Sequence, residues 1–173
     1  MRRAAAAVGA LGLAAALAGC GTSVPDTALP DLSGLGLATV ACDDTVQLAG
    51  IEEQAGEGAA VECWSGARDG SYVETADAVL ALLLSENESG EDISTALCWE
   101  DTLSDTEASA CRAILVGDTE DGAIVSAVVA LEDPATVVGA ISDDPSEDEV
   151  SEALGGAALE VLVFSEPASA ETG

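Results

Sequence analysis

Apolar residues recur every three or four positions in one long stretch of the chain that begins at residue 73. Its members are Val73, Ala76, Val79, Leu80, Leu83 and Leu84. This spacing places apolar side chains on one face of an α-helix. Just before the stretch, Ser71 and Glu74 have the spacing of a capping box, in which each side chain accepts a hydrogen bond from the other residue's backbone amide. The pattern predicts a helix capped by Ser71.

Two further helices are predicted from their capping residues. Ser146 and Glu149 repeat the capping-box spacing, and the pattern behind them ends near Gly155. The acidic first turn of this segment also suits the positive end of a helix dipole. Asp133 followed by Pro134 predicts a short helix, because proline is favoured at the first helical position.

Strands are predicted from runs rich in β-branched and apolar residues. Residues 94–101 alternate weakly, and residues 110–117 and 123–131 form two apolar runs joined by an acidic turn that ends in Gly122. Such a pair of runs is typical of a β-hairpin. The second run is apolar on both faces, which indicates a central strand covered from two sides. Residues 158–165 predict the last strand.

The order of these elements predicts the fold class. A helix over residues 43–53 and a strand after it are also expected. Because strands adjacent in the sequence alternate with helices elsewhere, the chain is predicted to be α+β. We expect an antiparallel or mixed sheet of about five strands with helices mainly on one face and two disulfides.

The composition combines a high apolar content with a strongly acidic charge. Hydrophobic residues make up 49% of the chain, so it can form a core, unlike an acidic disordered tail. There are 33 acidic residues against four arginines, with no lysine and no histidine. Such a surface repels nucleic acids and anionic lipid headgroups. The charge fits solubility or adaptation to a salty habitat; the alternative is a docking face for a cationic partner or Ca²⁺.

The N-terminus has the pattern of an export signal. Arg2 and Arg3 precede an apolar run over residues 4–17 that is too short to span a membrane. Residues 17–20, LAGC, resemble the lipobox of bacterial lipoproteins. The resemblance implies cleavage before Cys20, lipidation of that cysteine and a position on the extracytoplasmic face of the cell membrane. The alternative is ordinary secretory cleavage that leaves a free thiol, which would be reactive after export.

These features divide the chain into four parts. Residues 1–19 are the expected lipoprotein signal peptide, and residues 20–37 a lipidated N-terminus and flexible tether rich in Pro, Gly and Ser. Residues 38–165 are expected to form a single α+β domain. Residues 166–173 are expected to be a disordered tail.

Four cysteines remain in the expected domain, namely Cys42, Cys63, Cys98 and Cys111. An even number in an exported domain predicts two disulfides, with three possible connectivities. Zinc is an alternative on cysteine count, but zinc ligands are usually paired at short spacing. If the predicted strands around Cys98 and Cys111 lie side by side, these two residues can pair. We therefore expect Cys98–Cys111 together with Cys42–Cys63.

The missing residue types remove most catalytic chemistries. Without histidine there is no Ser-His-Asp triad and no imidazole metal site. Without lysine there is no Schiff base and no phosphate-binding loop of the usual kind. A hydrolase that uses two carboxylates stays a minor alternative, since no pair is singled out among the 33. We expect no enzyme activity and no cofactor.

A calcium site is a second alternative. Asp118, Glu120 and Asp121 supply three carboxylates in one tight loop. The loop departs from the EF-hand pattern and lacks its distal glutamate. A solvated acidic turn explains the same residues.

Two tryptophans and two arginines are the remaining candidates for ligand binding. Trp64 and Trp99 each follow a cysteine, which fits either packing against a disulfide or a shared ligand patch. Arg68 and Arg112 are the only cations after Cys20. Each fits either a structural ion pair or an anion site in a cleft.

Together these observations predict a membrane-anchored extracytoplasmic lipoprotein that acts as a binding module. Its expected partners are the membrane, through the lipid on Cys20, and an envelope protein or a cationic ligand. Nucleic acid is not expected to bind. The alternatives are a Ca²⁺-dependent surface module and, less favoured, a carboxylate-only hydrolase.

Overall fold

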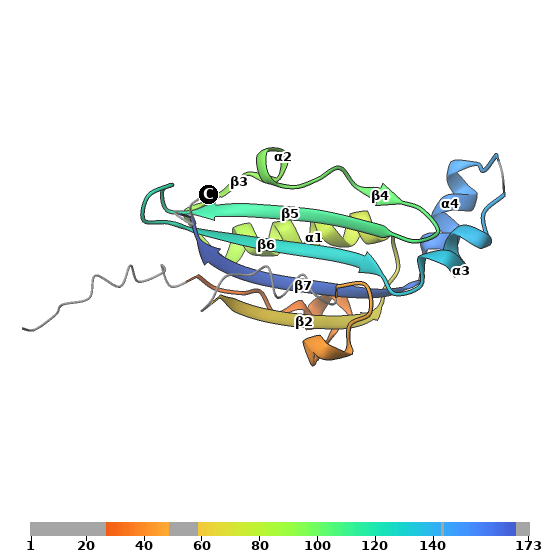
Figure 1. The fold of residues 1–173 in the computed structure, drawn as a ribbon, viewed down its shortest axis with the longest axis horizontal. Helices are drawn as coiled ribbons and strands as arrows, with labels where there is room; N and C mark the ends of the chain where they lie inside the picture. Colours follow the sequence, from red (N-terminus) through yellow and green to blue (C-terminus); the bar gives the residue numbers. More distant parts are fainter. Residues whose placement is uncertain (1–26, 49–58, 143, 169–173) are drawn as a thin grey trace, which may run out of the picture.

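The computed structural model describes residues 27–48, 59–142 and 144–168, and every strand in them belongs to one antiparallel sheet (Figure 1). Its order is β1-β2-β7-β6-β5-β3, and β4 also pairs with β5. The strands are β1 (Ala38–Val40), β2 (Ala60–Ala67), β3 (Gly90–Asp92), β4 (Thr102–Leu103), β5 (Ala108–Val116), β6 (Ala123–Leu131) and β7 (Ala158–Pro167). The helices are α1 (Tyr72–Glu86), α2 (Ser94–Leu97), α3 (Pro134–Gly139) and α4 (Glu147–Leu154).

The α+β class and both disulfides, Cys42–Cys63 and Cys98–Cys111, are confirmed. The sheet has seven strands, whereas about five were expected. The strands that were not predicted, β1, β3 and β4, are only two or three residues long. Strands this short carry no periodic pattern from which they could be predicted.

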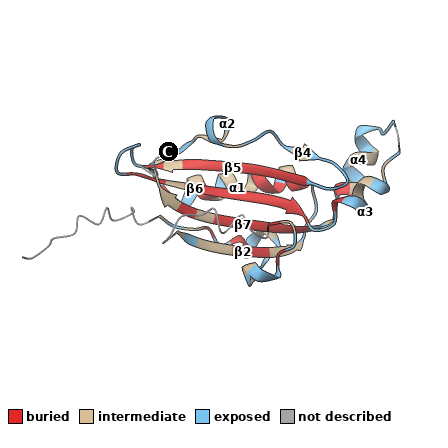
Figure 2. Ribbon diagram, in the orientation of Figure 1, coloured by how far each residue is buried: buried red, intermediate tan, exposed pale blue. Residues whose placement is uncertain are grey.

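The predicted hairpin forms the centre of the sheet. β5 and β6 pair from Ser109 opposite Ala130 to Val116 opposite Ala123. Gly122 closes their turn, and a Cβ atom at this position would lie 2.0 Å from the carbonyl oxygen of Asp118. Only glycine fits there. As its pattern predicts, β6 is buried on both faces along almost its whole length (Figure 2).

Helix α1 covers the first face of the sheet. Ser71 and Glu74 form the complete capping box that was predicted, with both reciprocal hydrogen bonds present. Behind this cap, Val79 and Leu83 are fully buried in a core shared with Val125 and Val129 of β6. The helix therefore buries its apolar stripe against the odd-numbered residues of β6.

In the part of the chain that the structure describes, loops lie over the second face. A smaller cluster forms there around Val128, Leu162 and Cys63, with Leu48 packed on it. Figure 1 looks onto this face, with α1 behind the sheet.

The helices were expected mainly on one face of the sheet, and the structure does not place them so. α1 covers the first face, α2 contacts β5 at the sheet edge, and α3 and α4 pack on each other beyond one end of the sheet (Figure 1). From α4, Leu154 reaches the first core.

Two local predictions were wrong. Residues 94–101 do not form a strand, since residues 94–97 make one helical turn and Cys98 follows in an extended conformation. In place of the helix expected over residues 43–53, a 3₁₀ turn (Cys42–Asp44) is followed by irregular chain to residue 48, and residues 49–53 lie outside the described ranges. In both segments, contacts to the sheet replace the local pattern.

The segment before β1 packs against the domain. Leu32, in a 3₁₀ turn (Leu32–Leu35), is fully buried, and Leu37 is 3% exposed. Gly66 of β2 allows the close approach, because a Cβ atom there would lie 2.9 Å from the carbonyl oxygen of Gly36. Residues 27–37 thus contribute to the core, although the sequence pattern assigned them to the tether.

Truncating Leu32 is expected to destabilise the whole domain. Because its side chain is fully buried, Leu32→Ala should lower the free energy of unfolding by about 2–5 kcal/mol, measured by urea denaturation. Val46→Ala is the matched control, since Val46 is 66% exposed and its truncation should change the value by less than about 0.5 kcal/mol. Equal stabilities of the two variants would contradict the packing of this segment.

Candidate functional site

The second face of the sheet is organised by one row of residues across four strands. Cys63 lies opposite Leu162, Leu162 opposite Val128, and Val128 opposite Cys111. Both disulfides start from the two ends of this row. Each one fastens a loop beside the second face, over which the described residues place no α-helix.

The first loop contains Cys42 and is also held by a buried carboxylate. Glu160 of β7 is 3% exposed, and it accepts hydrogen bonds from the backbone amides of Val46 at 2.6 Å and Gln47 at 2.8 Å. These charge-assisted bonds offset the cost of burying the glutamate. They fix the loop above β7, and Leu48 packs on Leu162 beyond it.

The second loop contains Cys98 and lies along the outer edge of β5. Between β3 and β4, the amide of Ala113 donates to Ser94 Oγ at 3.0 Å, and the amide of Ile93 donates to the carbonyl of Ala113 at 3.0 Å. Arg112 Nη1 donates to the carbonyl of Cys111 at 2.7 Å. Side chains therefore complete the edge of β5 where no strand pairs with it.

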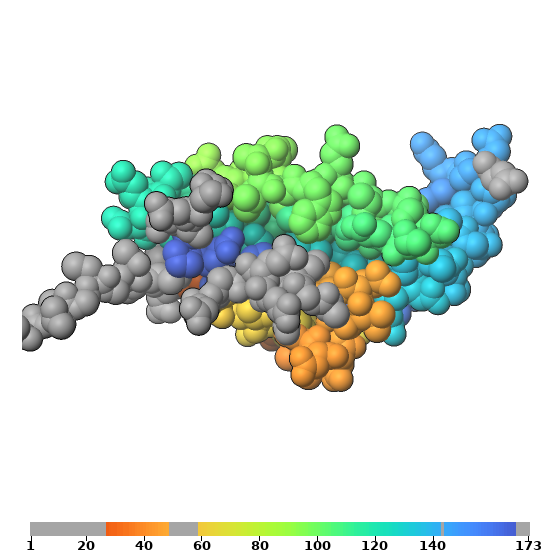
Figure 3. Space-filling model, viewed as in Figure 1, coloured from red at the N-terminus to blue at the C-terminus, as the bar shows by residue number. Residues whose placement is uncertain are grey.

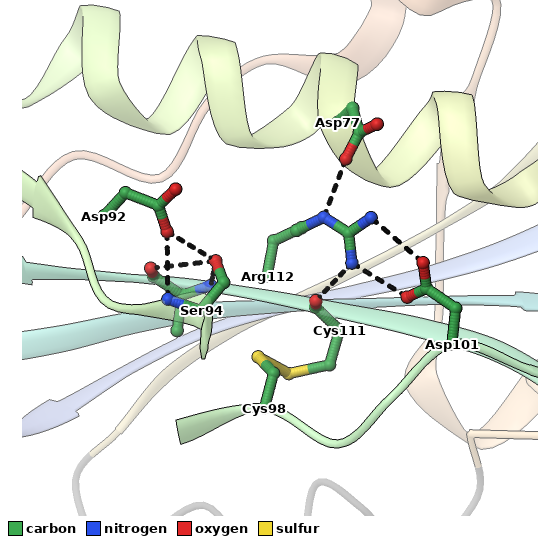
Figure 4. The surroundings of a disulfide bond; sticks show 8 residues. Asp77, Asp92, Ser94, Cys98, Asp101, Cys111 and Arg112 are labelled. Carbon is green, nitrogen blue, oxygen red and sulfur yellow. Dashed lines mark hydrogen bonds and ion pairs between the residues drawn. A yellow bond between two sulfur atoms is a disulfide. The ribbon is translucent and has the colours of Figure 1, made fainter. Parts of the chain in front are cut away.

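Arg112 and Cys111 point to opposite sides of β5 (Figure 4). Arg112 turns toward α1, where Nε contacts Asp77 at 2.7 Å and Nη1 contacts Asp101 at 2.9 Å. Its hydrogen bond to Asp101, supported by the one to Asp77, raises the pKa of the guanidinium. Arg112 is thus committed to a structural ion-pair cluster, and the geometry favours this interpretation over an anion site.

Trp99 follows the second disulfide and stays 46% exposed, beside Leu97, which is 50% exposed. An exposed indole is unusual in a chain with two tryptophans, one tyrosine and one phenylalanine. In Figure 3, residues 94–107, in green, lie along one side of the second face, and residues 42–48, in orange, lie on the other. Trp99 belongs to the green side.

Three surface hollows share Trp99 in their walls. The Gln47 hollow, of about 390 Å³, lies between the two loops and includes Glu107 and Val128. The Phe164 hollow, of about 280 Å³, includes Leu97 and Glu166, and also Val128. The Arg112 hollow, of about 570 Å³, lies between α1 and the loop that contains Cys98, at the outer edge of β5. We call Leu97, Trp99 and the walls of these hollows the Trp99 surface.

The Phe164 hollow is the most apolar part of the Trp99 surface and contains one carboxylate. Leu97, Trp99 and Phe164 form its walls together with Glu166. Burial raises the pKa of Glu166 above its ordinary value. The salt bridges among the described residues do not include Glu166. Its negative charge is therefore partly desolvated, and no cation among the described residues forms a salt bridge with it.

The Arg112 hollow is rich in carboxylates. Its walls contain Asp77, Asp92, Glu100 and Asp101. Arg112 is its one cation, and that residue is already paired. The potential in this hollow is therefore negative.

The structure places the two tryptophans on opposite sides of the sheet, which rules out a ligand patch shared by both. Trp64 is 6% exposed and packs in the first core, on the α1 side of the sheet. Trp99 lies by the second face. Core packing therefore explains Trp64, and only Trp99 is available to a ligand.

Arg68 lies just after β2, and its hydrogen bonds are to residues outside the Trp99 surface. Its Nε donates to the carbonyl of Asp69 at 3.3 Å, and its own carbonyl accepts from the amide of Gly156 at 3.0 Å. Arg68 does not line the hollows around Trp99.

The calcium candidates lie in the β5–β6 turn. Asp118 accepts hydrogen bonds from the amides of Glu120 and Asp121, both at 2.9 Å, and these bonds lower the pKa of Asp118. Its carboxylate therefore stabilises the turn by accepting these two hydrogen bonds. Within the described ranges, no group of three or more Asp, Glu, Cys or His side chains is arranged to hold a metal ion.

The expected lipidation site, Cys20, lies outside the described residues. None of the helices in the described ranges is long and apolar enough to cross a membrane.

Comparison of the chain with protein-family models, curated proteins and solved structures gave no match. The site must therefore be interpreted from its own chemistry.

Glu160 and Glu166 were not among the predicted candidates. For Glu160 the signal is a charged residue inside an apolar strand, since residues 158–165 contain one glutamate in a mainly apolar run. A charge at such a position needs a partner or a special role. Glu166 follows that run and has no such signal.

The partly buried position of Glu166 predicts a pH-dependent effect of Glu166→Gln. In the folded protein the pKa of Glu166 is raised, so its ionised form disfavours folding above that pKa, and the penalty disappears below the unfolded pKa. Glu166→Gln should therefore have a higher melting temperature than the wild type at pH 7, and the difference should shrink toward zero by about pH 4.

Glu152→Gln is the control for this experiment, because Glu152 is exposed on α4 and the same charge is removed. It reports the general relief of charge repulsion in this acidic protein. If Glu152→Gln raised the melting temperature as much as Glu166→Gln at every pH, burial of Glu166 would not be the cause.

Proposed function

We propose that the protein is an exported, lipid-anchored lipoprotein whose domain binds a partner through the Trp99 surface. The single observation that carries the binding role is the exposed Trp99, which is fixed beside a disulfide and shared by three hollows. Exposed aromatic residues next to apolar hollows are typical of interaction sites.

The cysteines support the anchored, extracytoplasmic location. Four of the five cysteines are joined in two disulfides, a modification that persists in oxidising compartments outside the cytoplasm. Cys20 has no cysteine left in this chain to pair with. That is consistent with the lipobox-like residues 17–20 and with a lipid on Cys20 as the membrane attachment.

Rigidity supports binding at Trp99. The Cys98–Cys111 disulfide joins the residue before Trp99 to β5, and Arg112 pairs with Asp101 two residues after it. The segment that carries Trp99 is therefore fastened on both sides of this residue before a partner binds. Pre-organised aromatic side chains lose little conformational entropy on binding.

The carboxylate-hydrolase alternative receives less support. Glu166 has a raised pKa, as a general acid would need. However, it is the one carboxylate in the described walls of the Phe164 hollow, whereas such hydrolases place two carboxylates across the scissile bond. Binding therefore accounts for this hollow better than hydrolysis does.

Lipidation is tested by labelling the full chain in a producing bacterium with an alkyne analogue of palmitate. The wild type should carry the label and sediment with membranes, whereas Cys20→Ser should lose both properties. Thr22→Ser is the matched control and should behave as the wild type. A wild-type chain that is exported but unlabelled would show ordinary secretory cleavage instead.

The binding role is tested by photo-crosslinking in intact cells. With benzoylphenylalanine in place of Leu97, the full chain should give a discrete adduct on irradiation, because Leu97 is exposed on the Trp99 surface. Ala135 is the matched control site, since it is exposed on α3 and does not line any of the three hollows. Absence of an adduct at Leu97, or equal adducts at both sites, would contradict the proposal.

A further inference from the structure

We propose that the Trp99 surface binds an extended segment of a partner protein in which a Lys or Arg lies two positions from an apolar side chain. This inference rests on the proposed binding function and specifies the partner's chemistry. It follows from the shape of the hollows, from the charges around them and from the occupants that those charges exclude.

The arrangement of the hollows favours an extended segment. The Gln47 and Phe164 hollows share Trp99 and Val128, so they adjoin on either side of one indole. Their volumes of about 390 and 280 Å³ can each receive a side chain. In an extended peptide, side chains two positions apart point the same way, at a separation of about 7 Å. Such a peptide can place two side chains across Trp99.

The chemistry of the walls requires an apolar component. Leu97 and Trp99 are exposed, and Val128 and Phe164 lie beneath them in the Phe164 hollow. Covering this group removes apolar surface from water. Tryptophan in particular contributes strongly at interface centres, and its ring attracts cations to its face.

Charge determines the polar component. The carboxylates in the walls of the three hollows are Asp77, Asp92, Glu100, Asp101, Glu107 and Glu166. The cation in these walls is Arg112, and its guanidinium already forms salt bridges with two of the six carboxylates, Asp77 and Asp101. Complementary charge speeds association and selects partners, so the favoured side chains are Lys and Arg.

Glu166 gives this preference a specific position. Its carboxylate lies in the apolar Phe164 hollow, where burial disfavours its charge and no described cation compensates it. An ammonium or guanidinium group that enters the hollow would supply the missing counter-charge. The aliphatic stem of Lys or Arg would at the same time cover Leu97 or Phe164.

The same charges exclude other occupants. The chain carries a formal net charge of −29, so a second copy, a nucleic acid or an anionic lipid surface would meet strong repulsion at this site. A small amine would fill only one hollow. A basic and apolar peptide segment satisfies both hollows and the charge.

The experiment uses the full chain, as isolated from producing cells in nonionic detergent, and fluorescein-labelled peptides. The probe is Gly-Leu-Ser-Lys-Ser-Leu, in which Lys and Leu two positions apart point the same way, compared with versions in which the lysine is replaced by Gln or by Glu. Fluorescence anisotropy should give a dissociation constant at least about tenfold lower for the lysine peptide than for the glutamine peptide, and no binding of the glutamate peptide. The preference should weaken between 50 and 500 mM salt, as roughly expected from the shorter Debye length.

Two pairs of variants locate the binding. Trp99→Ala should weaken binding of the lysine peptide by about tenfold or more, and Trp99→Phe should restore most of it. Glu166→Gln should weaken binding more than Glu152→Gln, although both remove one negative charge. Melting curves identify any variant that has lost its fold. If Trp99→Ala does not fold, the Glu166 pair decides the result.

Several outcomes would overturn the inference. These are equal affinity for the lysine and glutamate peptides, equal loss in Glu166→Gln and Glu152→Gln, competition by phosphatidylglycerol vesicles, or a stable dimer in sedimentation that masks Trp99. The proposed binding function is judged separately. An adduct at Leu97 in cells without selective peptide binding would overturn only the chemistry proposed for the partner, whereas the absence of that adduct would contradict the binding function itself.

Discussion

Burial of β6 on both of its faces is the constraint on which the rest of the structure depends. A strand that is apolar on two sides needs two covers, and the chain supplies them in different ways. On one face, α1 covers β5 and β6 with a regular apolar stripe. On the other face, irregular loops lie over Val128 and Leu162, and such loops bury little apolar surface of their own. They need other attachments, and these are the two disulfides and the buried Glu160.

This division of labour also explains where the candidate site lies. A helix that packs on a sheet seals it, whereas two separately fastened loops leave hollows between them. Trp99 stands at that position because Cys98 is bonded to Cys111, in the same cross-strand row as Cys63. The proposed binding surface thus results from the way in which the second face is covered. Its carboxylates come from α1, from β3 and the loops beside it, and from the end of β7.

The long, regular elements were predictable from the sequence, since α1 and β6 have strong periodic patterns and α1 has a complete capping box. The disulfide pairing was predicted correctly, but the reason was partly wrong. Cys98 does not lie in a strand beside Cys111; it follows the single helical turn of α2. The packing of Leu32 and the exposure of Trp99 could not be predicted, because both depend on contacts between residues distant in the chain. The sequence singled out Trp99 as one candidate of four, and it did not indicate Glu166.

The hydrogen bonds that Ser94 and Arg112 make along β5 have a consequence for the behaviour of the protein in concentrated solution. An apolar sheet with free edge groups is a template for strand addition, the first step of amyloid-like association. Here the gap between β3 and β4 is filled by a serine hydroxyl and a guanidinium, and the opposite edge is β1, which is three residues long. Within the described residues, both edges are therefore covered over part of their length, by β1 on one side and by β3, β4 and these side chains on the other. The chain can therefore keep a sheet rich in Val, Ala and Leu while resisting aggregation.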